Sequence, residues 1–183
     1  MKRHIALMVG ALAVVGSSTA VIAGSGGLFS AASASGSSCT FKGTAKFSPP
    51  LSLNTQKVNV TVSGTLSACG SNTYGITGGT VKASGSGDTT CNPDTSLPGL
   101  TTSGTIVWKG VKGTNDETST STGVPGSSPP EDTLSGTITG GSPVPAGTPT
   151  GGMITYKVTK KLTAQCEAGT LAKSSFSGTT TLS

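Results

Sequence analysis

The sequence predicts an all-β protein: a signal peptide followed by a single antiparallel β-sandwich, immunoglobulin-like in architecture with its topology left open, and stapled by two disulfides. Runs of alternating polarity recur along the chain, and Gly and β-branched residues fill it without any long 3.6-residue period. No helix is therefore expected after the signal peptide. The third observation is an even number of cysteines, 4, behind an export signal. Short, turn-rich connections favour antiparallel pairing.

The N-terminal residues have the three parts of a secretory signal peptide. A positive start, Met1-Lys2-Arg3-His4, precedes an apolar stretch from Ile5 to Val15 and an A-x-A cleavage site at Ala32-Ser33-Ala34. We expect residues 1–34 to be removed and residues 35–183 to form one domain, a length that suits a single core. Earlier cleavage is one alternative. An uncleaved membrane anchor over residues 5–23 is another, although glycines and hydroxyl residues dilute that stretch.

The mature chain carries Cys39, Cys69, Cys91 and Cys166. Four cysteines allow three pairings, and the sequence alone does not choose among them. Cys39–Cys69 is preferred, because a hairpin that turns near Asn54 would bring these two side by side; Cys91–Cys166 follows by elimination. No C-x-x-C spacing occurs and the mature chain has no His, so we expect no metal site and no cofactor.

The clearest alternation runs from Lys57 to Leu66. One face carries Val58, Val60, Val62, Gly64 and Leu66, and we expect it to be buried. The stretch from Cys39 to Phe47 alternates in the same way and ends at Pro49-Pro50. Further strands are expected at 75–86, 103–111, 133–140, 152–163 and 174–182, with a bulge or a snorkelling side chain at Lys160.

Two segments rich in Ser, Thr, Gly and Pro, at about 114–130 and 140–151, are expected to be long loops at one end of the domain. They serve either as binding loops or as solvated spacers. Elsewhere Ser-Gly-Thr recurs, as at Ser63-Gly64-Thr65, and its glycine is expected to let a neighbouring ring or the opposite sheet approach closely. Trp108, the single tryptophan, is expected to be a core anchor rather than a sugar-stacking platform.

Catalytic chemistry has little support. The only histidine, His4, lies in the signal peptide, which excludes Ser-His-Asp and Cys-His catalysis from the mature chain. The carboxylates are expected in turns and loops: Asp88, Asp94, Asp116, Glu117, Glu131, Asp132 and Glu167. If Glu131 and Asp132 met Asp116 and Glu117 across a cleft, the protein would be a hydrolase acting on extracellular glycans.

Charge excludes one class of partner. Charged residues are 10% of the chain, against about 25% in an average soluble domain, and the basic ones are scattered. Once Lys2 and Arg3 are removed the net charge falls from +5 to about +3. Nucleic-acid binding is therefore not expected.

The sequence thus predicts an exported, non-catalytic extracellular or cell-envelope protein with a binding or structural role, and leaves its ligand open. Its expected partner is extracellular or in the cell wall, with no integral membrane span after signal cleavage. The alternatives are the loop-carboxylate hydrolase and a small outer-membrane β-barrel, for which about eight strands suffice. The aromatic residues Tyr74, Trp108 and Tyr156 are too few for the two aromatic girdles of such a barrel.

The pattern as a whole resembles a group of uncharacterised exported β-rich proteins of actinobacteria. The matching stretches span nearly all of the mature chain: Cys39 with Phe41 and Gly43, Phe47-Ser48-Pro49-Pro50-Leu51, Val62-Ser63-Gly64-Thr65-Leu66 with Cys69, Cys91, Trp108-Lys109-Gly110, Cys166 and Phe176-Ser177-Gly178-Thr179. The resemblance implies export and a β fold, and carries over no site residue.

Export is directly testable. N-terminal sequencing of protein recovered from the culture medium or cell wall of its host should begin at Ser35 or within a few residues of it, because the A-x-A site ends at Ala34. Recovery of an intact Met1 from a membrane fraction would contradict the predicted cleavage.

Overall fold

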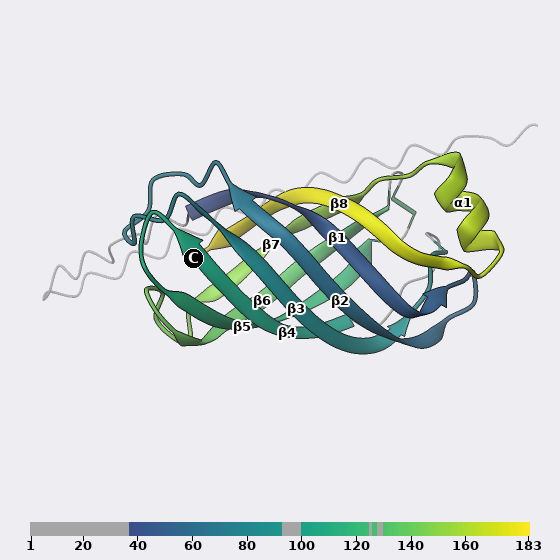
Figure 1. Cartoon of the computed structure of the whole chain (residues 1–183), viewed down its shortest axis with the longest axis horizontal. Coiled ribbons are helices and arrows are strands. Elements are labelled where there is room, and N and C mark those ends of the chain that lie inside the picture. The colour runs from purple at the N-terminus through teal and green to yellow at the C-terminus, as the bar shows by residue number, and fades with distance from the viewer. Residues whose placement is uncertain (1–36, 93–99, 125, 128–129) are drawn as a thin grey trace, which may run out of the picture. The chain divides into compact units, whose positions relative to one another are not determined.

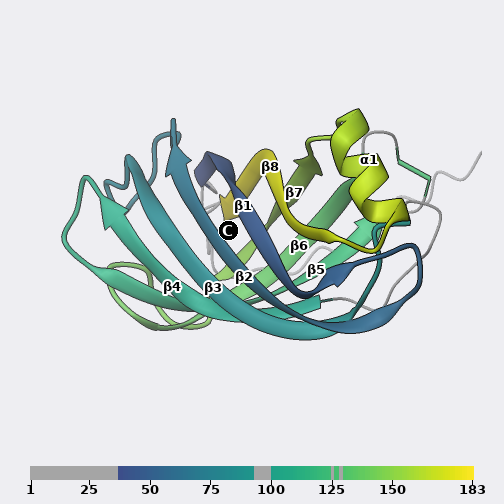
Figure 2. The same ribbon diagram turned by 45° about the vertical axis from the view of Figure 1, so that its right-hand side comes forward.

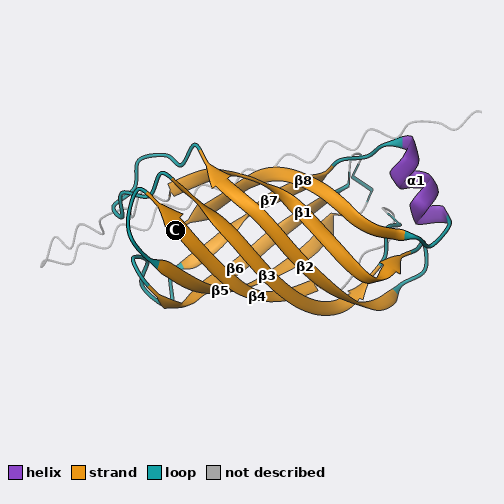
Figure 3. Cartoon of the chain, in the orientation of Figure 1, coloured by secondary structure: helices purple, strands orange, loops and turns teal. Residues whose placement is uncertain are grey.

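The computed structural model describes residues 37–92, 100–124, 126–127 and 130–183 (Figure 1). The predicted signal peptide lies outside these residues, as does Asp94. The described chain is almost entirely strand, with one short helix (Figure 3). The elements are β1 (Ser37–Leu51), β2 (Gln56–Ser67), β3 (Gly78–Thr89), β4 (Leu100–Lys109), β5 (Thr114–Val124), β6 (Glu131–Gly141), β7 (Pro149–Tyr156), α1 (Lys160–Glu167) and β8 (Leu171–Leu182).

The strands form a closed barrel, so the expected sandwich is wrong. Each strand pairs antiparallel with its sequence neighbours, and β1 also pairs with β8, with Phe41 opposite Gly178 and Gly43 opposite Phe176. Figures 1 and 2 show the strands winding obliquely around one axis. A sandwich and a barrel both bury one face of each strand, so alternation alone does not separate them. The pairing between the first and last strands, β1 and β8, is what distinguishes this barrel from a sandwich.

The alternation predicted for β2 is confirmed. Val58, Val60 and Leu66 are buried and point into the barrel, whereas Asn59 and Thr61 are exposed. Val62 is half-buried, because it faces a cavity described below rather than packed side chains. Trp108, expected in the core, is also buried.

Strand β5 occupies a segment predicted to be a loop. Thr114–Val124 pairs with β4 on one side and β6 on the other, so the loop expected over 114–130 is wrong for its first part. The loop expected over 140–151 is shorter, because β6 extends to Gly141 and β7 begins at Pro149. The inward positions of β5 carry polar residues, Glu117, Ser119 and Ser121 among them. A hydrophobic pattern therefore cannot reveal this strand.

Helix α1 was not expected, and the strand predicted over 152–163 ends at Tyr156. Lys160 begins the helix instead of marking a bulge. The Thr159 hydroxyl caps it by accepting a hydrogen bond from Leu162 N at 3.2 Å, and the buried Cys166 is disulfide-bonded to Cys91. An isolated helix of this length is marginal in water, so the cap and the disulfide hold it. The described residues contain no helix long and apolar enough to cross a membrane.

Both preferred disulfides are confirmed. Cys39 joins Cys69 across the β1–β2 hairpin, and Cys91 joins Cys166 over a sequence separation of 75. The first lies where β1 begins and β2 ends, and the second where β3 ends and β8 is about to begin, so the two bonds staple opposite ends of the barrel. Two disulfides indicate an oxidising compartment.

One end of the barrel is closed by a fully hydrogen-bonded amide. Asn115 has no exposed surface, and its Oδ1 accepts from Trp108 Nε1 at 2.8 Å and from Val144 N at 3.1 Å. Its Nδ2 donates to the carbonyl oxygens of Gly140 and Val144, both at 2.8 Å. These bonds tie the loop between β6 and β7 over the barrel end, where Val144 is itself fully buried. Because every polar atom of the amide is paired, it closes this end without an unsatisfied buried group.

The register of β2 leads to a stability prediction. Val60→Asp places a lone carboxylate inside the barrel and should unfold the domain or lower its free energy of unfolding by at least about 1–3 kcal/mol. Thr61→Asp, on the outer face of the same strand, should change it by no more than about 0.5 kcal/mol. Thermal melts of the two variants measure the gap, and equal melting temperatures would show that the register is wrong.

Candidate functional site

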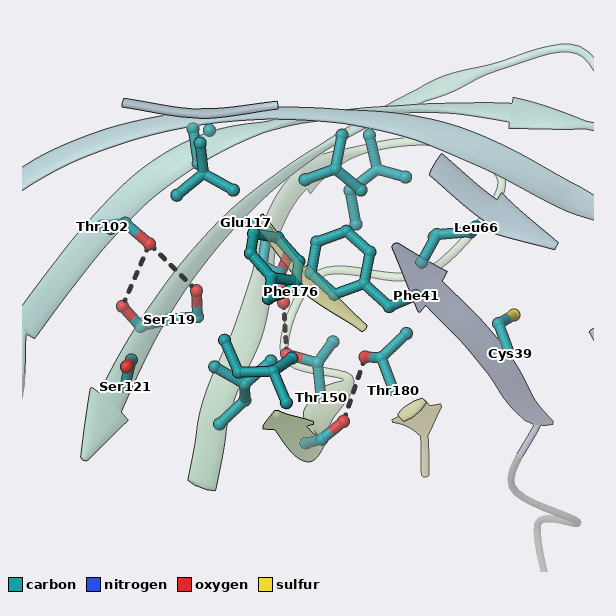
Figure 4. A pocket seen from close by; sticks show the side chains of 18 of the residues that line it. Cys39, Phe41, Leu66, Thr102, Glu117, Ser119, Ser121, Thr150, Phe176 and Thr180 are labelled. Carbon is teal, nitrogen blue, oxygen red and sulfur yellow. Dashed lines mark hydrogen bonds between the residues drawn. The ribbon is translucent and has the colours of Figure 1, made fainter. Parts of the chain in front are cut away.

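A cavity of about 90 Å³ lies inside the barrel. We call it the inner chamber; Figure 4 shows its lining, which includes Phe41, Phe176, Glu117, Thr102 and Thr150. Most barrels of eight strands have an interior just wide enough to be filled by side chains or to hold one small ligand. Here small residues at inward positions leave part of that interior unfilled.

The apolar side of the inner chamber is built around two phenylalanine rings. Phe41 and Phe176 meet edge to face with ring centroids 5.0 Å apart. Glycines make room for both rings: a Cβ on Gly64 would lie 2.5 Å from a Phe41 ring carbon, and one on Gly43 would lie 2.7 Å from Phe176. The close approach of a ring expected at Gly64 is therefore confirmed, and the pair forms a rigid apolar wall.

Hydroxyl groups line other parts of the inner chamber. The Thr102 hydroxyl lies 3.1 Å from that of Ser119, and Thr180 Oγ1 donates to Gly151 O at 3.0 Å (Figure 4). Thr150 Oγ1 donates to Glu117 Oε1. The inner chamber thus offers both dispersion contacts and hydrogen bonds, a combination typical of small-molecule sites.

Glu117 is the only carboxylate that lines the inner chamber among the described residues. Burial raises the pKa of its carboxyl group, and the hydrogen bond from Thr150 opposes that rise. Its second oxygen, Oε2, has no hydrogen-bond partner among the described residues. Since no buried polar side-chain atom of those residues lacks a partner, Oε2 keeps some accessible surface, and the inner chamber is the cavity that Glu117 lines.

A larger cavity, about 530 Å³, opens at the end of the barrel that carries α1. We call it the mouth cavity. Its apolar lining comes from strand ends and from the helix, and includes Phe47, Leu51, Val124, Leu162 and Leu171. Leu100 and Ser121 line both this cavity and the inner chamber, so the two spaces adjoin there.

A hydrogen-bonded trio lies beside this junction. Asp132 Oδ2 accepts from the Tyr156 hydroxyl at 3.0 Å and from the Ser121 hydroxyl. Burial raises the pKa of Tyr156 well above its usual value, and the negative charge of Asp132 and the hydrogen bond to it add to the effect. Tyr156 therefore stays a neutral donor that holds the Asp132 carboxylate in place.

The carboxylates expected in loops lie instead in regular structure. Asp88 is in β3, Asp116 and Glu117 in β5, Glu131 and Asp132 in β6, and Glu167 in α1. The structure does not bring together the two sets proposed for a hydrolase. Asp132 lies opposite Gly123, six positions along β5 from Glu117, which at about 3.3 Å per residue is roughly 20 Å. Glycosidases hold their paired carboxylates about 5–9.5 Å apart.

No group of three His, Cys, Asp or Glu side chains in the described part of the chain is arranged to hold a metal ion. All four cysteines are in disulfides, which removes them as ligands. The described side chains that line the two cavities offer apolar contact, hydrogen bonding and negative charge.

Sequence reasoning missed the importance of Glu117. The sequence places Glu117 with Asp116 in a loop, whereas the structure places both in β5 with their side chains on opposite faces, Asp116 exposed. The available signal was the alternation of Asn115, Glu117, Ser119 and Ser121 with Asp116, Thr118 and Thr120. This alternation does not reveal a strand, because the residues of both faces are polar.

The raised pKa of Glu117 predicts a pH-dependent effect of its replacement. Because the folded-state pKa lies above the unfolded value, ionisation of Glu117 costs nothing at low pH and destabilises the fold as pH rises past about 4.5. Glu117→Gln keeps the acceptor for Thr150 but cannot ionise. The melting temperature of Glu117→Gln relative to wild type should therefore be higher at pH 7 than at pH 4.

Thermal melts at the two pH values measure this, with the exposed Asp116→Asn as control. A relative melting temperature that is the same at both pH values, or higher at pH 4, would show that Glu117 is not buried as described.

The chain matches no protein-family model, no curated protein and no solved structure. The resemblance to exported actinobacterial proteins stays a prediction. The function must therefore be inferred from the cavities themselves.

Proposed function

We propose that the protein is an exported, non-catalytic binding protein that holds one small, largely apolar molecule in the inner chamber and the mouth cavity. One observation carries this proposal. The mouth cavity has a volume of about 530 Å³, within the range of about 300–1,000 Å³ common to small-molecule sites, and adjoins an unfilled barrel interior.

The two ends of the barrel differ in a way that supports a binding role, because one is closed and the other is open. The Asn115 network and the buried Val144 close one end. At the other end the strand ends and α1 surround an opening whose surface is largely apolar, although carboxylates also line it. A ligand that enters there would remove apolar surface from water, and this removal favours binding by about 25 cal/mol per Å².

Residence outside the cytoplasm is supported by the two disulfides and by the signal peptide predicted from the sequence. It fits a role in which the protein captures or carries a molecule in the medium or at the cell wall.

The outer face of the barrel argues against the outer-membrane alternative. Outward positions of β1 and β2 carry polar side chains, Lys42, Lys46, Lys57, Asn59 and Thr61 among them, while the apolar side chains point inward. A transmembrane barrel needs the reverse, an outward apolar band about 25 Å tall.

Filling the mouth cavity tests the proposal. Gly123 lines that cavity, and a Cβ there would lie 3.6 Å from Asp132 Oδ1, an ordinary contact. Gly123→Phe should weaken binding of the neutral fluorescent probe N-phenyl-1-naphthylamine at least about tenfold, since loss of about 1.4 kcal/mol of apolar contact suffices.

Gly140→Phe is the matched control. A Cβ on Gly140 would lie 3.5 Å from Asp116 Oδ2, and Gly140 lines neither cavity. Fluorescence titration of wild type and both variants gives the affinities. Equal weakening by both variants, or no probe binding by the wild type, would overturn the proposal.

A further inference from the structure

We propose that the ligand of the two cavities is a small amphipathic cation, an alkyl ammonium compound whose charged nitrogen reaches Glu117 and whose apolar body fills the mouth cavity. This inference rests on the proposed function and names the chemical class of its ligand. It stands on the shape of the cavities, on the distribution of charge around them, and on the free oxygen of Glu117.

Negative charge concentrates at the cavities of a chain that is basic as a whole. The net charge of the chain is +5, yet every carboxylate among the described residues except Asp116 lines one of the two cavities. These carboxylates are Glu117 in the inner chamber and Asp88, Glu131, Asp132 and Glu167 at the mouth. Lys157 is the one lysine of the described residues that lines either space. Carboxylates around an opening steer a cation towards it and repel an anion.

Glu117 supplies the acceptor at the inner end. Thr150 occupies Oε1, whereas Oε2 keeps some accessible surface. No basic side chain contributes to the environment of the carboxylate, which is set by burial and by Thr150. A buried carboxylate without a cationic partner is costly, and an ammonium group that donates to Oε2 would remove that cost. A neutral donor would supply the hydrogen bond without the compensating charge, and an anion would supply neither.

Aromatic rings surround the same spaces. Aromatic residues are 4% of the chain, and within its described part all of them except Tyr74 line one of the two cavities. Phe41, Phe176 and Trp108 line the inner chamber, and Phe47 and Tyr156 the mouth. Ring faces attract ammonium groups and ring bodies pack against alkyl chains, so both parts of the ligand find suitable surfaces.

The inner chamber is small, about 90 Å³, and the mouth cavity is several times larger. The charged head therefore fits inside and the apolar body outside it, against Leu51, Val124, Leu162 and Leu171. Leu100 and Ser121, which line both spaces, would contact the ligand where head and body join.

Three probes that share an eight-carbon chain separate charge from apolar contact: n-octylamine, 1-octanol and octanoate. At pH 7 the first is a cation, the second is neutral and the third is an anion. Isothermal titration calorimetry gives the affinities, and Trp108, the single tryptophan, reports occupancy of the inner chamber by its fluorescence. We expect n-octylamine to bind most tightly and octanoate most weakly.

Glu117→Gln should lower the ratio of the n-octylamine and 1-octanol affinities about 10- to 100-fold, the range for a hydrogen bond to a charged group. The ratio is insensitive to the fraction of folded protein. Asp116→Asn removes the same charge from the neighbouring, outward-facing residue of β5 and should leave the ratio unchanged.

The outcomes are distinct. Binding of 1-octanol or octanoate as tight as that of n-octylamine, or an unchanged ratio in Glu117→Gln, would overturn the cationic ligand while leaving a small-molecule carrier intact. An equal fall of the ratio in Asp116→Asn would also overturn it, because the effect would then come from net charge alone. If none of the three probes binds, the proposed function itself fails.

Discussion

The pairing of β1 with β8 is the constraint on which the rest of the structure depends. It leaves the sheet without an edge strand, so no row of backbone N–H and C=O groups is left to pair with another chain. Closure also gives every strand one face that points into the barrel and one face that points to solvent. The hydroxyl-rich sequence then presents Thr, Ser and Lys to solvent, and the inward side chains of all strands share one space.

That shared space is only partly filled, because the chain places small and polar residues at inward positions where a self-contained core would carry large apolar ones. Gly43 and Gly64 accommodate the Phe41 and Phe176 rings on one side. On the other side β5 contributes Glu117 and Ser119, whose burial is unfavourable unless each is hydrogen-bonded. Thr150 hydrogen-bonds to Glu117, and Thr102 hydrogen-bonds to Ser119. The polar atoms that these bonds leave unpaired face the inner chamber.

Sequence reasoning predicted the parts of the fold in which burial and hydrophobicity coincide. It found the alternation of β2, the burial of Trp108 and the Cys39–Cys69 bond from local signals, and the Cys91–Cys166 bond by elimination. It missed β5, whose two faces are both polar, and α1, which a cap and the Cys91–Cys166 bond hold rather than helix propensity. It also predicted a sandwich, because closure is a property of strand pairing and leaves no mark on alternation. The candidate site was missed for the same reason as β5.

The central claim is that a ligand lies inside this barrel, with its head at Glu117 and its body at the α1 end. Intermolecular nuclear Overhauser effects between n-octylamine and ¹³C-labelled protein test it most directly. We expect contacts from the methylene next to nitrogen to Thr150, and from the terminal methyl to Leu100, which lines both cavities. Contacts confined to outward-facing apolar residues, such as the exposed Val107 and Met153, would contradict it.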